Sequence, residues 1–356
     1  MTFDISMDRA NVKCQDLTPF IPFIMFTGAS GGHIMPALAF RKHFPNSVLV
    51  AVKTSASEEI LKGVDGVMFI RPLALKKIKL SAIADIARVI FFAREFKPEK
   101  ILCFGSYLNA VGTFCAKISG VKLYFFEPNA VPGKGTSLLK YFADEIFEVF
   151  PGAGEGLKKN TVFCKFPVSA LKYGRDDARG KLGFDFQKPV ILILGGSQGS
   201  GFINDIILRL LPKLGFAQII HITGSADFGR VNKAYNAHRG NHLIFSVSRN
   251  MPLFYSAADT AVSRAGAGTL AELAFYKIPS LLIPYPLAAA HQERNADFFS
   301  KSGAAIIIKQ RNVTENNIFE AIEKITFRDF WKFSENLAKI SLSDDGSDLA
   351  EKISGE

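Results

Sequence analysis

Short runs of consecutive apolar residues recur along the chain, and most of them end in a loop of small or polar residues. Runs of about four to eight apolar residues, bounded in this way, are typical of strands buried in a parallel sheet. The predicted strands span residues 20–26, 48–52, 101–104, 123–126, 147–150, 190–194, 219–223, 242–245 and 280–283. Between several of them, apolar residues recur at helical spacing. Strands that alternate with helices predict an α/β fold.

The succession of strand, glycine loop and helix occurs twice. The strand at 20–26 leads into a loop with glycines at 28, 31 and 32, and the strand at 190–194 leads into the glycine loop 195–201. A chain of 356 residues is long for one core and sufficient for two. We therefore predict two Rossmann-like domains that face each other across a cleft, at 19–167 and 168–340. An N-terminal extension at 1–18 and a polar, fraying tail at 341–356 complete the chain.

The first glycine loop argues against two common classes of nucleotide-binding protein. It does not match the GxGxxG pattern of dinucleotide-binding proteins, and no acidic residue closes the strand at 48–52. No Gly-Lys-Ser/Thr sequence, which P-loop proteins require, follows any glycine loop. Neither class is therefore indicated.

The run Ser263-Arg264-Ala265-Gly266-Ala267-Gly268-Thr269-Leu270-Ala271-Glu272 predicts a loop that feeds a helix. Residues 266–269 would lie at the helix N-terminus, whose unpaired N–H groups and positive dipole end suit an anion. Glu272 suits that dipole, or accepts hydrogen bonds from the vicinal hydroxyls of a sugar. A tight crossover, in which the glycines serve only close packing, explains the stretch equally well.

Polar side chains follow several predicted strands, and in α/β proteins ligands bind at the carboxyl edge of the sheet. His33 follows two glycines there and is suited to act as a base near neutral pH, although helix capping explains it too. Glu127 and Asn129 offer a carboxylate and an amide to sugar hydroxyls, unless the segment is only a turn. In the second half the polar residues at this edge are Ser197, His291 and Gln292.

Two features of the composition are unusual, namely 33 phenylalanines and a net charge of +10. They indicate an acidic partner with an apolar component. Basic and aromatic residues form no RNA-binding signature and no zinc-finger or basic-zipper pattern appears, so an anionic membrane surface fits better than nucleic acid. The four cysteines lack metal-ligand spacing, which indicates reduced thiols and no metal site. We expect no signal peptide at the start of the chain and no membrane span.

A short basic and apolar segment precedes the helix predicted after residue 80. Its residues are Lys76, Lys77, Ile78, Lys79 and Leu80. The apolar side chains are hard to bury there, and a basic residue near an anionic bilayer contributes about 1 kcal/mol. We therefore predict a membrane patch at these five positions. In the following helix, Ile83, Ile86 and Ile90 are expected to face the core.

Five segments together resemble, in order and spacing, the MurG family: residues 27–39, 105–107, 127–133, 195–204 and 263–296. Within them the motifs GGSQG, SRAG.GT..E and HQ..NA occur at the family's separations. This family transfers N-acetylglucosamine from UDP-N-acetylglucosamine to the lipid-linked muramyl pentapeptide of peptidoglycan synthesis, which converts lipid I to lipid II. The resemblance implies a GT-B glycosyltransferase, with no cofactor, on the cytoplasmic face of the bacterial inner membrane. It also implies that the C-terminal domain holds the donor and the N-terminal domain the lipid acceptor.

Carried over by position, the resemblance implies a set of residues that bind UDP-N-acetylglucosamine. They are Ser30, Gly31, Gly32, Asn129, Ser169, Ser197, Ser248, Gly266, Ala267, Gly268, Thr269, Leu270, Ala271, Glu272, His291 and Gln292. Among them, Glu272 would take the ribose hydroxyls, residues 266–269 the diphosphate, and Ser248 would lie against the uracil.

The resemblance further implies that His33 deprotonates the muramyl 4-hydroxyl in an inverting reaction, with Glu127 as a second catalytic residue. The chain departs from the family at position 169. Where the family has Asn-Pro-Val-Arg, this chain has Phe-Pro-Val-Ser, so a donor-site arginine is replaced by Ser169.

Two other functions fit the same residues. One is a GT-B transferase that acts on another lipid, such as diacylglycerol. The other is a catalytically weakened scaffold that binds a UDP-sugar, which Ser169 favours. Transfer to lipid I and not to diacylglycerol distinguishes the first, and donor binding without transfer distinguishes the second.

Overall fold

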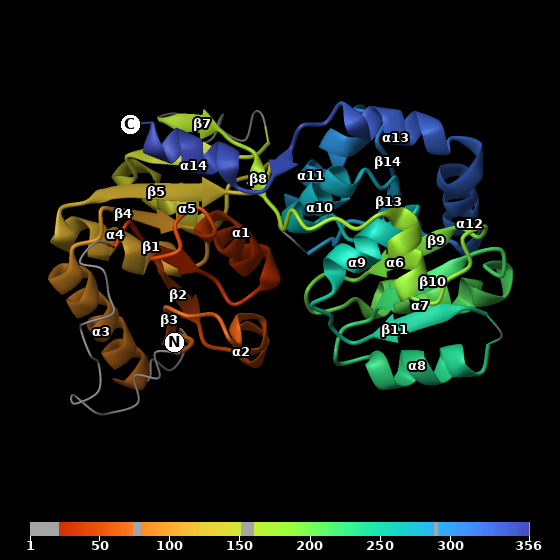
Figure 1. The fold of residues 1–356 in the computed structure, drawn as a ribbon, viewed down its shortest axis with the longest axis horizontal. Helices are drawn as coiled ribbons and strands as arrows, with labels where there is room; N and C mark the ends of the chain where they lie inside the picture. The colour runs from red at the N-terminus through yellow and green to blue at the C-terminus, as the bar shows by residue number, and fades with distance from the viewer. Residues whose placement is uncertain (1–20, 74–79, 151–159, 239, 288–290, 356) are drawn as a thin grey trace. The chain divides into compact units, whose positions relative to one another are not determined.

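The computed structural model describes residues 21–73, 80–150, 160–238, 240–287 and 291–355. The chain divides into two compact units. Unit 1 comprises Met1–Pro167 and Asp345–Glu356, and unit 2 comprises Val168–Asp344. Each unit is a sheet flanked by helices (Figure 1). The predicted extension at 1–18 lies outside the described residues.

Unit 1 is a doubly wound parallel sheet. Its elements are β1 (Phe23–Thr27), α1 (Gly31–Arg41), β2 (Val48–Val52), α2 (Ser55–Leu61), β3 (Val67–Ile70), α3 (Leu80–Phe96), β4 (Lys100–Cys103), α4 (Leu108–Ser119), β5 (Lys122–Glu127), α5 (Lys134–Leu139), the 3-10 turn η1 (Lys140–Phe142), β6 (Glu145–Glu148), β7 (Thr161–Phe163), β8 (Phe166–Pro167) and α14 (Ser347–Ser354). The strand order is β3-β2-β1-β4-β5-β6-β7, and each neighbouring pair is parallel. The order reverses direction between β1 and β4, which is the position where such sheets bind ligands.

The two faces of this sheet are covered differently. Because side chains alternate along a strand, Phe23 and Ile24 point to opposite faces. Ile24 belongs to an aliphatic core that includes Val89 of α3 and Val111 of α4. On the other face, the ring of Phe23 lies 5.3 Å from that of Phe40 in α1. Phenylalanines therefore form much of the packing between the sheet and α1.

Helix α3 turns two of the three predicted isoleucines, Ile86 and Ile90, toward the core, and leaves Ile83 outside it. Ile83 is 50% exposed, and Ile86 and Ile90 are only partly buried. The fully buried apolar positions are Ala82, Val89 and Ala93. Small residues allow the helix to lie close to the sheet, so the larger isoleucines fall at the margin of the contact and Ile83 beyond it.

The end of the chain packs on unit 1. The sequence predicts a polar tail at 341–356, whereas the structure has helix α14, with Leu349 and Ile353 buried one helical turn apart. This helix packs against α1 and β8 (Figure 1), and the Lys100 ammonium donates a hydrogen bond of 2.6 Å to the Ile353 carbonyl. The apolar stripe of α14 is too short to stand out within a polar segment.

Unit 2 repeats the plan of unit 1. Its elements are α6 (Arg175–Lys181), β9 (Val190–Leu194), α7 (Gly201–Leu210), η3 (Leu211–Lys213), β10 (Gln218–Ile222), α8 (Phe228–Asn236), β11 (His242–Phe245), α9 (Met251–Ala257), β12 (Thr260–Ser263), α10 (Ala267–Tyr276), β13 (Ser280–Leu282), α11 (His291–Lys301), β14 (Ala305–Ile307), η4 (Gln310–Asn312), α12 (Glu315–Glu323), the π-helical turn η5 (Lys324–Arg328), α13 (Phe330–Ala338) and β15 (Ser343–Asp344). The strand order is β11-β10-β9-β12-β13-β14, all parallel. The order reverses between β9 and β12.

The core of unit 2 is aliphatic. Ile191 and Ile193 of β9 pack with Ile203 and Ile207 of α7, and all four side chains are fully buried. The Val168 N–H donates a 2.8 Å hydrogen bond to the Asp344 carbonyl, which holds the first and last residues of unit 2 together. Within the described part of the chain, no helix combines the length and the apolar character that crossing a membrane requires.

Candidate functional site

In unit 1, His33 lies at the point where the strand order reverses. It sits in the first turn of α1, directly after β1, and its ring borders the loop that follows β4. A Cβ atom on Gly28 would come within 2.7 Å of His33 Nδ1, and one on Gly105 would come within 3.1 Å of His33 Nε2. Gly105 also has φ +94, which side-chain-bearing residues rarely adopt. The two glycines therefore make the space that the imidazole occupies.

The environment of His33 keeps the ring neutral. Burial lowers the pKa of His33 below its usual value. Ser30, the N-cap residue of α1, places its Oγ 3.1 Å from His33 Nδ1. When Ser30 accepts this hydrogen bond, Nδ1 carries the proton and Nε2 is the basic nitrogen. Gly31 and Gly32, the other predicted donor contacts in this loop, are the first two residues of α1.

Glu127 holds its own loop in place. It ends β5 and is 2% exposed. One carboxylate oxygen accepts hydrogen bonds from the backbone and side-chain nitrogens of Asn129, each 3.2 Å long, and the other accepts from the Gly133 N–H at 2.9 Å. Burial raises the pKa of Glu127, and these hydrogen bonds oppose the rise. Glu127 thus fixes the position of Asn129, and the predicted catalytic role stays a prediction.

In unit 2, the glycine loop after β12 lies at the corresponding reversal point, beside the loop after β9. Gly266 is the N-cap residue of α10. The loop is held from α11, since the Gln292 side-chain oxygen accepts from the Ala265 N–H at 3.2 Å and from the Tyr285 N–H at 2.9 Å. Asn295 donates to the Ala265 carbonyl at 3.3 Å. The amide nitrogen of Gln292 forms no hydrogen bond within the described residues, so it is available to a ligand.

The predicted ligand residues of α10 differ in what they offer. Ala267, Gly268 and Thr269 form its first turn. Leu270 and Ala271 are fully buried, so their side chains are not available to a ligand. Glu272 accepts a 2.7 Å hydrogen bond from the Tyr255 hydroxyl of α9 on one oxygen, and burial raises the pKa of Glu272 to about 7.

The second carboxylate oxygen of Glu272 has no hydrogen-bond partner in the part of the chain that the structure describes. Tyr255 is fully engaged, since its ring also stacks on Tyr276 with ring centres 5.0 Å apart. The sequence gives no sign of the Tyr255 contact, because the two residues lie on different helices. The arrangement leaves one carboxylate oxygen of Glu272 for a hydroxyl of a ligand.

The remaining predicted residues are less organised. Ser197 is exposed in the loop after β9. Ser248 accepts a hydrogen bond of 3.0 Å from the Asn250 N–H, which shapes the turn before α9. Ser169 is half-buried one residue after unit 2 begins. His291 begins α11 instead of ending a loop. Of the membrane patch, Leu80 is 85% exposed at the start of α3, and the positions from 76 to 79 lie outside the described residues.

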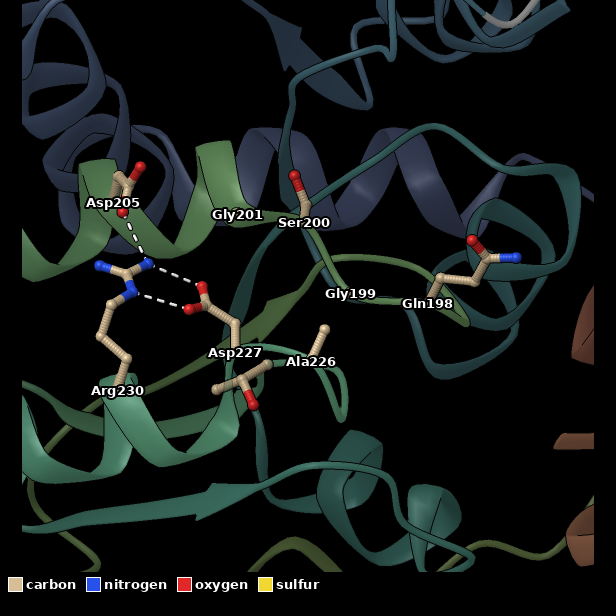
Figure 2. A pocket seen from close by; sticks show the side chains of 9 residues that line it. Gln198, Gly199, Ser200, Gly201, Asp205, Ala226, Asp227 and Arg230 are labelled. Atoms are coloured by element: carbon tan, nitrogen blue, oxygen red, sulfur yellow. Dashed lines mark hydrogen bonds and ion pairs between the residues drawn. The ribbon is translucent and has the colours of Figure 1, made fainter. Parts of the chain in front are cut away.

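A hollow of about 550 Å³ opens beside the loop after β9 (Figure 2). It is lined by Gln198, Gly199, Ser200, Gly201, Asp205, Thr223, Ala226, Asp227 and Arg230. The Arg230 guanidinium forms ion pairs of 2.7 Å with both Asp205 and Asp227 (Figure 2). Its charge is therefore already compensated by these two carboxylates.

A buried polar network supports the residues that line this hollow. His221 is fully buried, and burial lowers its pKa to about 3, so its ring is neutral. Its Nε2 lies 3.0 Å from the Asn204 side-chain oxygen, and Asn204 donates to Asp227 at 2.7 Å. Because Asn204 uses its NH₂ group as the donor, His221 carries its proton on Nε2. The sequence does not predict this network, which rigidifies the loops after β9 and β10.

Comparisons with known proteins agree with this two-unit arrangement. The glycosyltransferase family 28 N-terminal domain matches residues 23–148, and the glycosyltransferase family 28 C-terminal domain matches residues 190–344. The UDP-N-acetylglucosamine--N-acetylmuramyl-(pentapeptide) pyrophosphoryl-undecaprenol N-acetylglucosamine transferase of Chlorobium luteolum is 32% identical over 84% of this chain and 88% of its own length. The protein of the same name from Prochlorococcus marinus strain NATL2A is 30% identical over 86% of this chain and 92% of its own length.

Among solved structures, that of Acinetobacter baumannii MurG superimposes with a TM-score of 0.69 at 24% identity, covering 94% of this chain and 99% of that one. This likeness shows the fold, which is the GT-B glycosyltransferase architecture with two parallel-sheet α/β domains.

Proposed function

The chain belongs to the family of UDP-N-acetylglucosamine:N-acetylmuramyl-(pentapeptide) pyrophosphoryl-undecaprenol N-acetylglucosamine transferases, and we propose that it carries out this family's reaction. It transfers N-acetylglucosamine from UDP-N-acetylglucosamine to lipid I and so forms lipid II for peptidoglycan. The observation that carries this proposal is that each unit presents polar groups at its own reversal point, with His33 in unit 1 and the glycine loop before α10 in unit 2.

Unit 2 binds the donor. The N–H groups at the start of α10 and the dipole of that helix suit the diphosphate. The unpartnered oxygen of Glu272 accepts from the ribose hydroxyls, and the amide nitrogen of Gln292 is placed to donate to the sugar. Ser248 lies against the uracil, and Ser197 offers a hydroxyl to a phosphate oxygen. All of these groups lie within one unit.

His33 is the base. The muramyl 4-hydroxyl oxygen attacks the anomeric carbon of N-acetylglucosamine, the bond between that carbon and the diphosphate oxygen breaks, and UDP leaves. The hydroxyl proton passes to His33 Nε2, which is the basic nitrogen when Nδ1–H donates to Ser30 Oγ. Attack from the side opposite the leaving group inverts the anomeric centre. The lowered pKa of His33 keeps the imidazole unprotonated at neutral pH before each turnover.

Unit 1 docks on an anionic membrane surface, where the acceptor resides. Five apolar or aromatic side chains of this part of unit 1 are exposed: Leu80 (85%) and Phe91 (65%) of α3, Phe114 (52%) of α4, Leu138 (78%) of α5 and Tyr141 (80%) of η1. Helix α3 packs against α4, and α4 packs against α5, so these side chains belong to one group of helices (Figure 1). Apolar side chains with basic residues among them suit an interface of headgroups and acyl chains.

Basic side chains accompany these exposed rings. The Lys117 ammonium lies 4.2 Å from the centre of the Phe142 ring, and that of Lys140 lies 5.2 Å from the Tyr141 ring. We expect the basic segment 76–80 to extend this surface, and no nucleic acid to compete for it.

Acceptor preference tests the proposed function. Labelled N-acetylglucosamine is offered as its UDP donor with a soluble lipid I analogue or with diacylglycerol, and UDP-glucose replaces the donor in a parallel reaction. Transfer to the lipid I analogue from UDP-N-acetylglucosamine supports the proposal. Transfer to diacylglycerol points to another glycolipid. Donor binding without transfer points to the scaffold that Ser169 favours.

A further inference from the structure

Arg264 is a buried cation that forms no ion pair with a described residue. It follows β12 directly and is 6% exposed. Its guanidinium donates to the carbonyls of Ile283 and Pro284 at 3.0 and 3.4 Å and to the Ser200 hydroxyl at 2.8 Å. It also lies 5.3 Å from the centre of the Tyr285 ring. Every partner is uncharged.

No carboxylate forms an ion pair with Arg264 in the described ranges. The nearest segment in sequence that they omit, 288–290, consists of three alanines and so contains no acid. The contrast within unit 2 is Arg179, which is 5% exposed and forms an ion pair with Asp259. Within the described residues, two arginines are thus buried to the same degree, and of the two only Arg179 is paired with a carboxylate.

Burial of an ion is costly, because desolvation removes hydration that a paired ion recovers from its partner. Burial lowers the pKa of Arg264, yet a guanidinium stays protonated at neutral pH. Two helix N-termini add positive potential at the same place, since Ser200 is the N-cap residue of α7 and Gly266 is that of α10. Among the described residues, Arg264 and these two helix N-termini therefore favour an anionic group of a ligand between the two loops.

We propose that Arg264 is a positioning residue, which holds the donor loops of unit 2 in place and makes their electrostatic potential suit the diphosphate of the donor. Its guanidinium connects the loop after β9, through the hydrogen bond to Ser200, to the carbonyls that follow β13. From behind these loops, its positive charge attracts the negative charge of the diphosphate. The inference rests on the proposed function, because it assumes that the anion is the donor diphosphate.

Binding constants for UDP-N-acetylglucosamine, UDP and uridine test this role, because uridine lacks the diphosphate. Isothermal titration calorimetry is carried out on the full chain and on Arg264→Met, Arg264→Lys and Arg311→Met. Arg311 is exposed, so its replacement removes the same net charge from the surface and serves as the control. Thermal melting of each free protein reports its folding.

We expect Arg264→Met to weaken UDP and UDP-N-acetylglucosamine by about tenfold to a hundredfold, as one charge acting over several ångströms in a partly desolvated site would do. Uridine should change by less than about twofold. Arg264→Lys should recover most of the affinity because it restores the charge, and Arg311→Met should bind as the parent does. The melting temperature of Arg264→Met reports the balance between the buried ion that is removed and the three hydrogen bonds that are lost, and it separates a folding defect from a binding defect.

Equal weakening of uridine and UDP in both Arg264 variants would reduce the residue to a structural support and overturn the inference. Unchanged UDP binding by Arg264→Met would overturn it as well. If Arg264→Met does not fold, the comparison of UDP with uridine in Arg264→Lys decides, and a loss shared by both ligands counts against the proposal. Failure of the parent chain to bind UDP-N-acetylglucosamine would instead refute the proposed function itself, and the inference with it.

Discussion

Donor affinity should fall as the pH is lowered from 8 to 6, because Glu272 titrates in this interval. Burial raises the pKa of Glu272 to about 7, and the hydrogen bond from Tyr255 opposes the rise. The deprotonated carboxylate accepts the ribose hydroxyls, whereas the neutral acid is a weaker acceptor. The donor therefore binds the deprotonated form of Glu272, which predominates above pH 7 and is lost below it.

The magnitude follows from this pKa. If only the carboxylate binds, the apparent Kd varies as one plus the ratio of protonated to deprotonated Glu272, so it rises about tenfold between pH 8 and pH 6. Hydrogen bonds to a charged group contribute about 1.5–3 kcal/mol, which is sufficient to sustain a change of this size. Tyr255→Phe removes the donor that stabilises the carboxylate, so the pKa of Glu272 should rise and the transition should move to higher pH.

Calorimetric titration of UDP-N-acetylglucosamine at half-unit steps of pH measures this effect. The sugar nucleotide is the better ligand than UDP, since its diphosphate is esterified at both ends and does not ionise in this range. Glu272→Gln is the matched control, with a weak and pH-independent Kd. A flat profile in the parent chain, or a pH dependence that persists in Glu272→Gln, would show that Glu272 does not receive the ribose.

Three further predictions concern other parts of the molecule. His33→Ala should lower turnover by about two to four orders of magnitude and leave the Kd of the donor unchanged; a fully active variant would exclude His33 as the base. Leu80→Asp should reduce co-sedimentation with anionic vesicles, whereas Trp331→Asp, at a 76% exposed site in unit 2, should not; equal binding by both variants would contradict the membrane surface. Gly199→Ala should lower the melting temperature by several degrees, because Gly199 has φ +80 and a Cβ atom there would lie 2.2 Å from a backbone oxygen. Gly229→Ala is the control and should be neutral, because there is open space around Gly229. A larger loss in Gly229→Ala than in Gly199→Ala would contradict the loop geometry.

The buried sheets were the most predictable part of the fold. The apolar runs at 48–52, 190–194 and 242–245 coincide with β2, β9 and β11. Strands buried on both faces consist of consecutive apolar residues, so their pattern is clear in the sequence. The exposure of Ile83 in α3 and the final helix α14 were not predictable in this way, because both depend on which surface of a distant sheet is left to cover.

The candidate site was predictable in its loops and not in its internal contacts. Glycine patterns and strand ends placed His33 and Gly266 at the edges of their sheets, because the carboxyl ends of parallel strands meet there. The partners of Glu272 and Arg264 are Tyr255 and Ser200, which lie on other elements. Periodicity within one element carries no information about such pairings, since the register between elements decides them.

Conversion of lipid I by the purified chain, followed by mass spectrometry and by the anomeric coupling of the product, tests the central claim most directly. We predict a product that is heavier by one N-acetylhexosamine and linked through an inverted anomeric carbon, with one UDP released per sugar transferred. Donor that stays intact in the presence of lipid I, despite measurable binding of UDP-N-acetylglucosamine, would contradict the claim that this chain is a transferase.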